Sequence, residues 1–207
     1  MRRALLLLVP LALFGLASRF AGFEVRPRGS SELDVSTGVY TLPSGGTITD
    51  NRSGLVLEAR YIQYKEGEFI RAQGATLRSR EGDFSASSLE YLQKPDTLRL
   101  NGVRFSSKEI RGLSAQQGLL LKEDVLVLKG EVRSSEPYLE ASVVVVDTSQ
   151  NLALVLGNFS FRDGATTLRG NRPDSTLLLS FAEGRVRAST RVPAEILNRL
   201  RPYADRL

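Results

Sequence analysis

Residues 125–132 read VLVLKGEV, and this stretch decides the fold because related runs recur along the chain. Glycines at positions 74, 102, 130, 157 and 184 lie 28, 28, 27 and 27 residues apart. Each accompanies an apolar run, and the runs occupy residues 69–77, 98–105, 125–132, 152–161 and 177–186. Between them lie segments that open with an apolar-x-Ala pattern, at residues 57–59, 84–86, 113–115 and 139–141. Each period of about 27 residues therefore holds two strands, which is typical of an all-β fold.

Alternation within the runs predicts how the strands are buried. In LRL at residues 98–100 and VRF at residues 103–105, apolar side chains alternate with arginines, as in a sheet with one buried face. Gly102 and Gly157 fall where this alternation shifts by one residue, so we expect bulges or bends there that redirect the strand. The apolar positions that we expect to face the interior are Leu100, Val103, Phe105, Leu126, Leu128, Leu154, Leu156, Phe159, Phe161, Leu179 and Phe181.

Two antiparallel β layers whose apolar faces meet would explain this pattern. In a closed sandwich or solenoid the interior is filled by side chains, whereas in a splayed one it remains an apolar trough. The periodicity fits both geometries, and for any single interior residue simple core packing is the commoner role. Tyr64 and Tyr91 occupy matched positions of the repeat, where we expect them to anchor turns or to lie on a rim that touches a ligand.

The composition excludes many kinds of chemistry. The 207 residues include no His and no Cys, which rules out His-based triads, thiolate nucleophiles, the usual zinc sites and disulfides. The sequence contains no glycine-rich phosphate loop and no nucleophile elbow. Acidic pairs such as Glu66 and Glu68 fall in predicted turns, where solvation explains them. We therefore expect no enzymatic activity and no cofactor.

The net charge of +5 is concentrated at the two ends of the chain. Residues 1–28 and residues 185–207 each carry a net charge of +4, whereas residues 29–184 hold 17 positive and 20 negative side chains. A domain that binds nucleic acid needs a basic face on its folded body. The slightly acidic centre supplies none, so we expect no nucleic-acid partner.

The N-terminus has the features of an export signal. Arg2 and Arg3 precede the uncharged residues 4–18, and the secretion machinery reads such a charged start before an apolar stretch. Residues 4–23 comprise 20 positions with only Arg19 charged, which is long enough to cross a bilayer. We expect residues 1–23 to anchor the chain in the inner membrane, with the main domain in the periplasm. Cleavage after the small-x-small residues 15–17 remains open.

The remaining segments complete the expected domain organisation. Residues 24–54 are rich in Gly, Ser, Thr and Pro and predict a tether with a first strand near residues 38–42. Residues 55–190 form the β domain, and residues 191–207 form a C-terminal tail. In this tail Ile196, Leu197, Leu200 and Tyr203 fall on one side of a short helix, which Pro202 would interrupt.

Several stretches within residues 54–190 follow the pattern of a known family. They include LEARYIQY at residues 57–64, the related residues 84–91, and LVLKGEV at residues 126–132. Near the end, residues 164–171 and 177–186 continue the pattern. In these stretches the chain resembles the periplasmic lipopolysaccharide-transport proteins of the LptA and LptC family, also called OstA-like, and it is most similar to LptC.

The resemblance implies a twisted, V-shaped β-jellyroll with an apolar trough for lipid acyl chains, lined by the eleven interior positions. It implies that lipopolysaccharide or a related lipid passes from an inner-membrane ABC transporter to a periplasmic bridge protein, which docks edge to edge. One alternative is a soluble, LptA-like bridge component. Another is an extracytoplasmic structural β-solenoid module. A third is a β-helical enzyme acting on polysaccharides, which would gather carboxylates on one outer face.

Overall fold

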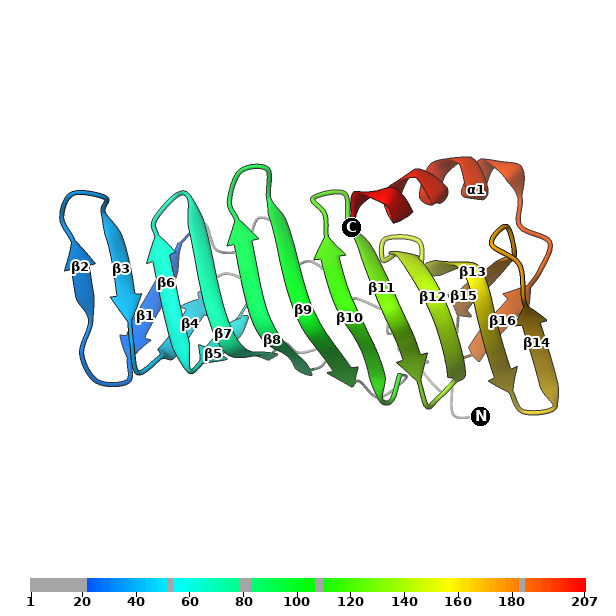
Figure 1. The fold of residues 1–207 in the computed structure, drawn as a ribbon, viewed down its shortest axis with the longest axis horizontal. Coiled ribbons are helices and arrows are strands. Elements are labelled where there is room, and N and C mark those ends of the chain that lie inside the picture. Colours follow the sequence, from blue (N-terminus) through cyan, green and yellow to red (C-terminus); the bar gives the residue numbers. More distant parts are fainter. Residues whose placement is uncertain (1–21, 52–53, 79–82, 107–109, 183–184) are drawn as a thin grey trace, which may run out of the picture.

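The computed structural model describes residues 22–51, 54–78, 83–106, 110–182 and 185–207. In this part of the chain, 16 strands form one antiparallel sheet, and the strands follow one another along the long axis of the molecule (Figure 1). The all-β prediction is therefore confirmed. Most of the predicted N-terminal anchor and the fifth repeat glycine, Gly184, lie outside the described residues. Within these residues, none of the helices has the length and apolar character needed to cross a membrane.

Seven long strands form the centre of the sheet, and each pairs with the next along the chain. Their lengths follow from the repeat, because each period supplies one strand that contains a glycine and one that begins near an apolar-x-Ala pattern. These strands are β7 (Phe69–Arg78), β8 (Asp83–Leu92), β9 (Thr97–Ser106), β10 (Leu113–Leu120), β11 (Val125–Ser134), β12 (Tyr138–Asp147) and β13 (Leu152–Asp163).

Each long strand contributes to two layers, and the outermost strands show how. The first half of β7 pairs with β6 (Tyr61–Lys65), whereas its second half pairs with β5 (Val56–Ala59). At the other end, the first half of β13 pairs with β15 (Thr176–Ala182) and its second half with β14 (Thr166–Gly170). The sheet is therefore folded over along a line that crosses the middle of the long strands.

We call the two halves layer 1 and layer 2. Layer 1 begins with β2 (Glu32–Asp34), β3 (Val39–Leu42) and β6, and it ends with β15 and β16 (Arg185–Ser189). Layer 2 begins with β1 (Phe23–Pro27), β4 (Gly46–Asp50) and β5, and it ends with β14. In Figure 1, β2 lies at one end of the molecule, and β14 and β16 lie at the other.

Glycines mark the fold line on the odd-numbered long strands. Gly102 has φ of +60°, and the interior side chains switch from Leu98 and Leu100 before it to Val103 and Phe105 after it. Gly157 has φ of +79° and lies opposite a shift of register in β12. The predicted irregularities are therefore present, as a change of facing at Gly102 and a shift of register opposite Gly157. Glycine occupies both positions because it adopts a positive φ without strain.

Residues 24–54, where we expected a tether with one strand, contain most of β1 and all of β2, β3 and β4. The expected strand near residues 38–42 is β3. The other three strands were missed because they are short and separated by Gly, Ser and Pro residues, a composition that also suits a linker. Because β3 pairs with β6 and β4 pairs with β5, these strands extend each layer by two strands at the N-terminal end.

The C-terminal tail is helical, as its apolar spacing predicted. Helix α1 (Ala194–Leu200) continues into a 3-10 helix, η1 (Arg201–Arg206), with Pro202 at the start of the second. The two helices lie along the end of the sheet formed by β11 to β16 (Figure 1). They pack on the outer face of layer 1, where Leu200 is completely buried.

Candidate lipid-binding interior

The facing surfaces of the two layers form one continuous apolar cluster. Every strand from β4 to β13 contributes buried side chains to it, and so does β15. Side chains at the two ends of the sheet are only partly buried against it. At the N-terminal end these are Phe23, Val25 and Tyr40, and at the C-terminal end they include Phe181 and Val186. The apolar interior therefore extends to both ends of the stacked layers.

Nine of the eleven predicted interior positions lie in or against this cluster. Eight of them have exposed fractions of 6% or less, and Phe181 is partly buried. The most enclosed aromatic side chains are Phe161, 1% exposed, and Phe105, 2% exposed. The nine residues are Leu100, Val103, Phe105, Leu126, Leu128, Phe159, Phe161, Leu179 and Phe181. Between the layers, their side chains pack together as a filled core.

Leu154 and Leu156 lie on the opposite face from the one we expected. They belong to a second apolar cluster on the outer face of layer 1, whereas their neighbours Ala153 and Val155 face the interior. Every residue from 152 to 156 is apolar, so alternation could not tell which set points inward. The strand is apolar on both faces because the C-terminal helices cover its outer face.

This second cluster joins the C-terminal helices to the sheet. On the helices, Leu200 is buried and Ile196, Leu197 and Tyr203 are partly buried, as is Leu207 directly after them. On the sheet, the contacts come from β10 to β13 and from Leu121 beside them. The buried members on the sheet side are Leu119, Leu121, Val125, Val127, Val145 and Leu154. A surface that would otherwise expose large apolar side chains is covered in this way.

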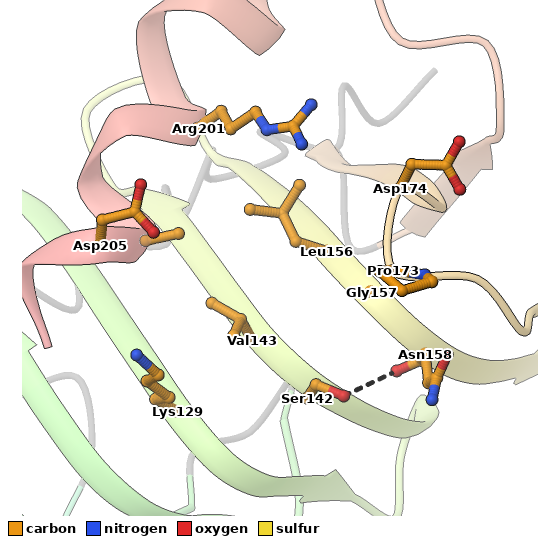
Figure 2. Close-up of a pocket in the computed structure, with 11 residues that line it drawn as sticks. Lys129, Ser142, Val143, Leu156, Gly157, Asn158, Pro173, Asp174, Arg201 and Asp205 are labelled. Atoms are coloured by element: carbon orange, nitrogen blue, oxygen red, sulfur yellow. Dashed lines mark hydrogen bonds between the residues drawn. The ribbon is translucent and has the colours of Figure 1, made fainter.

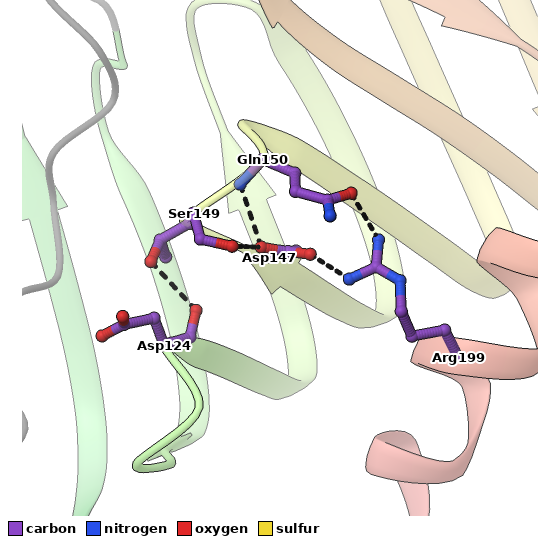
Figure 3. Close-up of polar contacts among 6 residues, drawn as sticks. Asp124, Asp147, Ser149, Gln150 and Arg199 are labelled. Carbon is purple, nitrogen blue, oxygen red and sulfur yellow. Dashed lines mark hydrogen bonds and ion pairs between the residues drawn. The ribbon is translucent and has the colours of Figure 1, made fainter.

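A buried carboxylate fixes helix α1 to the sheet (Figure 3). Asp147, whose side chain is 2% exposed, forms an ion pair with Arg199. It also accepts hydrogen bonds from Ser149 Oγ at 2.7 Å and from the backbone N–H of Gln150 at 3.0 Å. Arg199 donates a second hydrogen bond to Gln150 Oε1 at 2.8 Å. Burial opposes ionisation, but the hydrogen bonds and the charge of Arg199 outweigh it and lower the pKa of Asp147.

We predict that this ion pair makes attachment of the helices dependent on pH. Because the folded-state pKa of Asp147 lies below its ordinary value of 3.8, its contribution is complete well above pH 4 and is lost as the pH falls through the folded-state pKa. At pH 7, Asp147→Asn should destabilise the protein by about 1 to 2 kcal/mol in urea unfolding. At about pH 2 the difference from the unmodified protein should shrink. An equal difference at both pH values would contradict this assignment.

A cavity of about 440 Å³ lies beside the C-terminal helices on the outer face of the sheet (Figure 2). Val143 and Leu156 are among its apolar lining residues, and Lys129, Arg201 and Asp205 are among the charged ones. Lys129 Nζ donates a hydrogen bond to the backbone oxygen of Leu207 at 2.6 Å. This cavity is separate from the space between the layers, so it does not belong to the candidate lipid path.

The two matched tyrosines have different surroundings. Tyr91 Oη donates a hydrogen bond to Asp96 Oδ1 at 2.9 Å, and both residues are buried, so Tyr91 anchors the turn after β8. Tyr64 is 8% exposed and lies among other aromatic rings at the N-terminal end of the interior. Burial, together with the nearby Tyr40 and Glu66, raises the pKa of Tyr64, so its hydroxyl remains neutral at physiological pH.

The described residues offer no constellation for a metal. No group of three or more Asp or Glu side chains among them is arranged to hold a metal ion. The geometry of this part of the chain is that of a stacked, two-layer antiparallel β protein with an apolar interior.

Comparisons with known proteins give a weak structural likeness. No family model and no curated protein matches the chain. The chain is similar to a crystal structure of LptH from Pseudomonas aeruginosa, which is described as the LptA-homologous periplasmic component of the lipopolysaccharide transport device. The sequence identity is 14%, the TM-score is 0.40, and the match covers 86% of this chain and 99% of that chain. At these values the likeness carries no argument about function.

Proposed function

We propose that this chain is a membrane-anchored periplasmic lipid-transfer protein. In this proposal it passes lipopolysaccharide or a related outer-membrane lipid along its interior, from an inner-membrane ABC transporter to a periplasmic bridge protein. The observation that carries the proposal is the apolar cluster between the layers, which continues to partly exposed apolar side chains at both ends. A domain that needed only a core would be expected to close these ends with polar residues.

Hydrocarbon burial supplies the physical reason for such an interior. Each methylene group removed from water contributes about 0.8 kcal/mol, so a lipid with several long chains does not cross an aqueous space unassisted. A continuous apolar path lowers that barrier. Because the core residues are packed together, the layers must separate locally as a chain enters.

The proposed partners would dock at the edges of the sheet. At the N-terminal end, β2 presents Glu32 and Asp34 on an exposed strand. At the C-terminal end, β16 presents Arg185 and Arg187. In the described residues each of these strands pairs on one side only, so its other side has backbone groups available for strand addition. The opposite charges would direct an acidic partner strand to β16 and a basic one to β2.

The proposed activity makes and breaks no covalent bond. The transporter would supply the energy, and the chain would act as a passive conduit. An LptA-like soluble bridge is the same proposal without the anchor. The filled interior favours a second candidate, in which the protein is an extracytoplasmic structural module and the cluster serves only as its core.

Photo-crosslinking at three positions would test the proposal. A photoreactive residue at Phe105 faces the interior, one at Leu154 is buried beneath the C-terminal helices, and one at Arg99 is exposed. We expect lipid adducts in cells from position 105 and not from positions 154 or 99. Position 154 is the matched control, because it is as buried as position 105 but does not lie between the layers. Adducts from position 99 alone would exclude the conduit, and their absence at all three would favour the structural module.

A further inference from the structure

Three aromatic rings meet at the N-terminal end of the interior. Phe23 is the first residue of β1 in layer 2, whereas Tyr40 on β3 and Tyr64 on β6 belong to layer 1. The rings of Phe23 and Tyr64 are in edge-to-face contact, with centroids 5.6 Å apart and an interplanar angle of 81°. Tyr40 stacks on Tyr64 with centroids 5.0 Å apart and an angle of 7°. The contact between Phe23 and Tyr64 therefore joins the two layers.

The burial of these rings places them at the boundary between the interior and solvent. Tyr64 is 8% exposed and belongs to the interior cluster. Phe23 and Tyr40 are partly exposed and pack against that cluster. A hydrocarbon chain that moved along the interior at this end would meet the three rings.

Among the described residues, the strand that carries Phe23 pairs with fewer strands than β3 or β6 does. In the described residues β1 is an edge strand that pairs only with β4, and Phe23 is the terminal residue of this pairing, opposite Asp50. Moving Phe23 away from Tyr64 displaces β1 at its end, without breaking the pairing of the strand beyond it. An aromatic pair contributes less free energy than the burial of about three methylene groups, so an entering acyl chain can displace the ring.

We propose that Phe23, Tyr40 and Tyr64 form an aromatic gate at the N-terminal end of the interior, which an entering hydrocarbon chain displaces. This inference rests on the proposed lipid-transfer function and deepens it by assigning the point of entry. β1 begins at Phe23, the last residue of the segment that the sequence predicts to be a membrane anchor, so this end of the interior would lie nearest the bilayer that supplies the lipid.

The rate of uptake of a fluorescent fatty acid, cis-parinaric acid, by the full-length protein would test the gate. Phe23→Ala removes the contact between the layers, and we expect uptake in stopped-flow measurements to be faster by about two- to tenfold, the size of one aromatic pair. Tyr138→Ala is the control, because Tyr138 is a partly exposed aromatic residue on β12 in contact with Arg162. The control should take up the probe at the unmodified rate. A Phe23→Ala rate equal to that of the control would overturn the gate.

A reversible crosslink gives a second, independent measurement. The chain has no cysteine, so Phe23→Cys and Tyr64→Cys can be joined by a short reducible thiol crosslinker without side reactions. Crosslinking should slow uptake, and dithiothreitol should restore it. Unchanged uptake in the crosslinked protein would also overturn the gate while leaving the conduit intact. Failure of the unmodified protein to take up any probe would instead reject the proposed function itself.

Discussion

Replacing Gly45 with alanine is expected to lower the free energy of unfolding by about 3 kcal/mol or more. Gly45 lies in the turn between β3 and β4 with φ of +72°. A Cβ atom there would lie 2.0 Å from the backbone oxygen of Ala59 and 2.7 Å from the backbone carbon of Arg60. Ala59 is the last residue of β5 and Arg60 connects β5 to β6, so these backbone atoms cannot move aside as a flexible side chain would. The loss is measured by urea unfolding followed by circular dichroism.

Gly54 provides a matched control for this substitution. Its φ of +70° is nearly the same as that of Gly45, but a Cβ atom at Gly54 would have no neighbour within 4 Å among the described residues. Gly54→Ala therefore carries the backbone strain without the steric clash, and we expect a loss of about 1 to 2 kcal/mol. If the two variants lost equal stability, the close approach at Gly45 would not be the cause.

This turn illustrates what the sequence predicted and what it did not. Pro43-Ser44-Gly45-Gly46 identified a turn, but its composition suits a linker as well as a tight connection between two strands. The distinction depends on β5, β6 and β7, which hold β3 and β4 in place from later in the chain. Local propensity carries no information about such partners, so the expected tether was wrong for this part of the chain.

The central repeat could be predicted because both of its signals are local. A strand with one solvent face alternates apolar and polar residues, and a glycine at the fold line interrupts that alternation, as at Gly102. Alternation is lost where the outer face is also covered, and there the prediction was wrong for Leu154 and Leu156. At residues 125–128, 143–146 and 152–156 the chain is apolar at every position, and each of these runs contains buried residues of both clusters. Two features of the sequence together were the available signal for a helix packed on the sheet. These features are the unbroken apolar runs in the strands and the amphipathic segment at the C-terminus.

The residues of the proposed gate were harder to find. Tyr64 stood out because it matches Tyr91 in the repeat, but its partners are separated from it by 41 and 24 positions in the chain. Phe23 was expected to end the membrane anchor. The ring of Phe23 reaches Tyr64 of layer 1 only because β1 pairs with β4 at the edge of layer 2.

Replacing Phe161 with alanine is the second change expected to have a large effect. Phe161 is 1% exposed and lies in β13 between Leu139 and Leu168 of the neighbouring strands. Loss of a buried phenylalanine side chain lowers the free energy of unfolding by about 3 to 5 kcal/mol, because apolar burial is lost and an apolar cavity is left behind. Phe181→Ala is the control at the end of the same interior. Since Phe181 is only partly buried, its loss should be about 1 to 2 kcal/mol.

The response of these proteins to a fatty acid separates the two candidate functions. A ligand that binds only the folded state stabilises it by about 2.7 kcal/mol at a concentration of 100 times its Kd. If the interior admits hydrocarbon, dodecanoate below its critical micelle concentration should stabilise the unmodified protein. It should stabilise Phe161→Ala more, because the substitution leaves a cavity where the ligand would otherwise have to displace a phenylalanine side chain. If the cluster is only a core, the unmodified protein should show no stabilisation. The layers would then serve to hold the sheet together, and the conduit would be rejected even if Phe161→Ala bound the ligand in its new cavity.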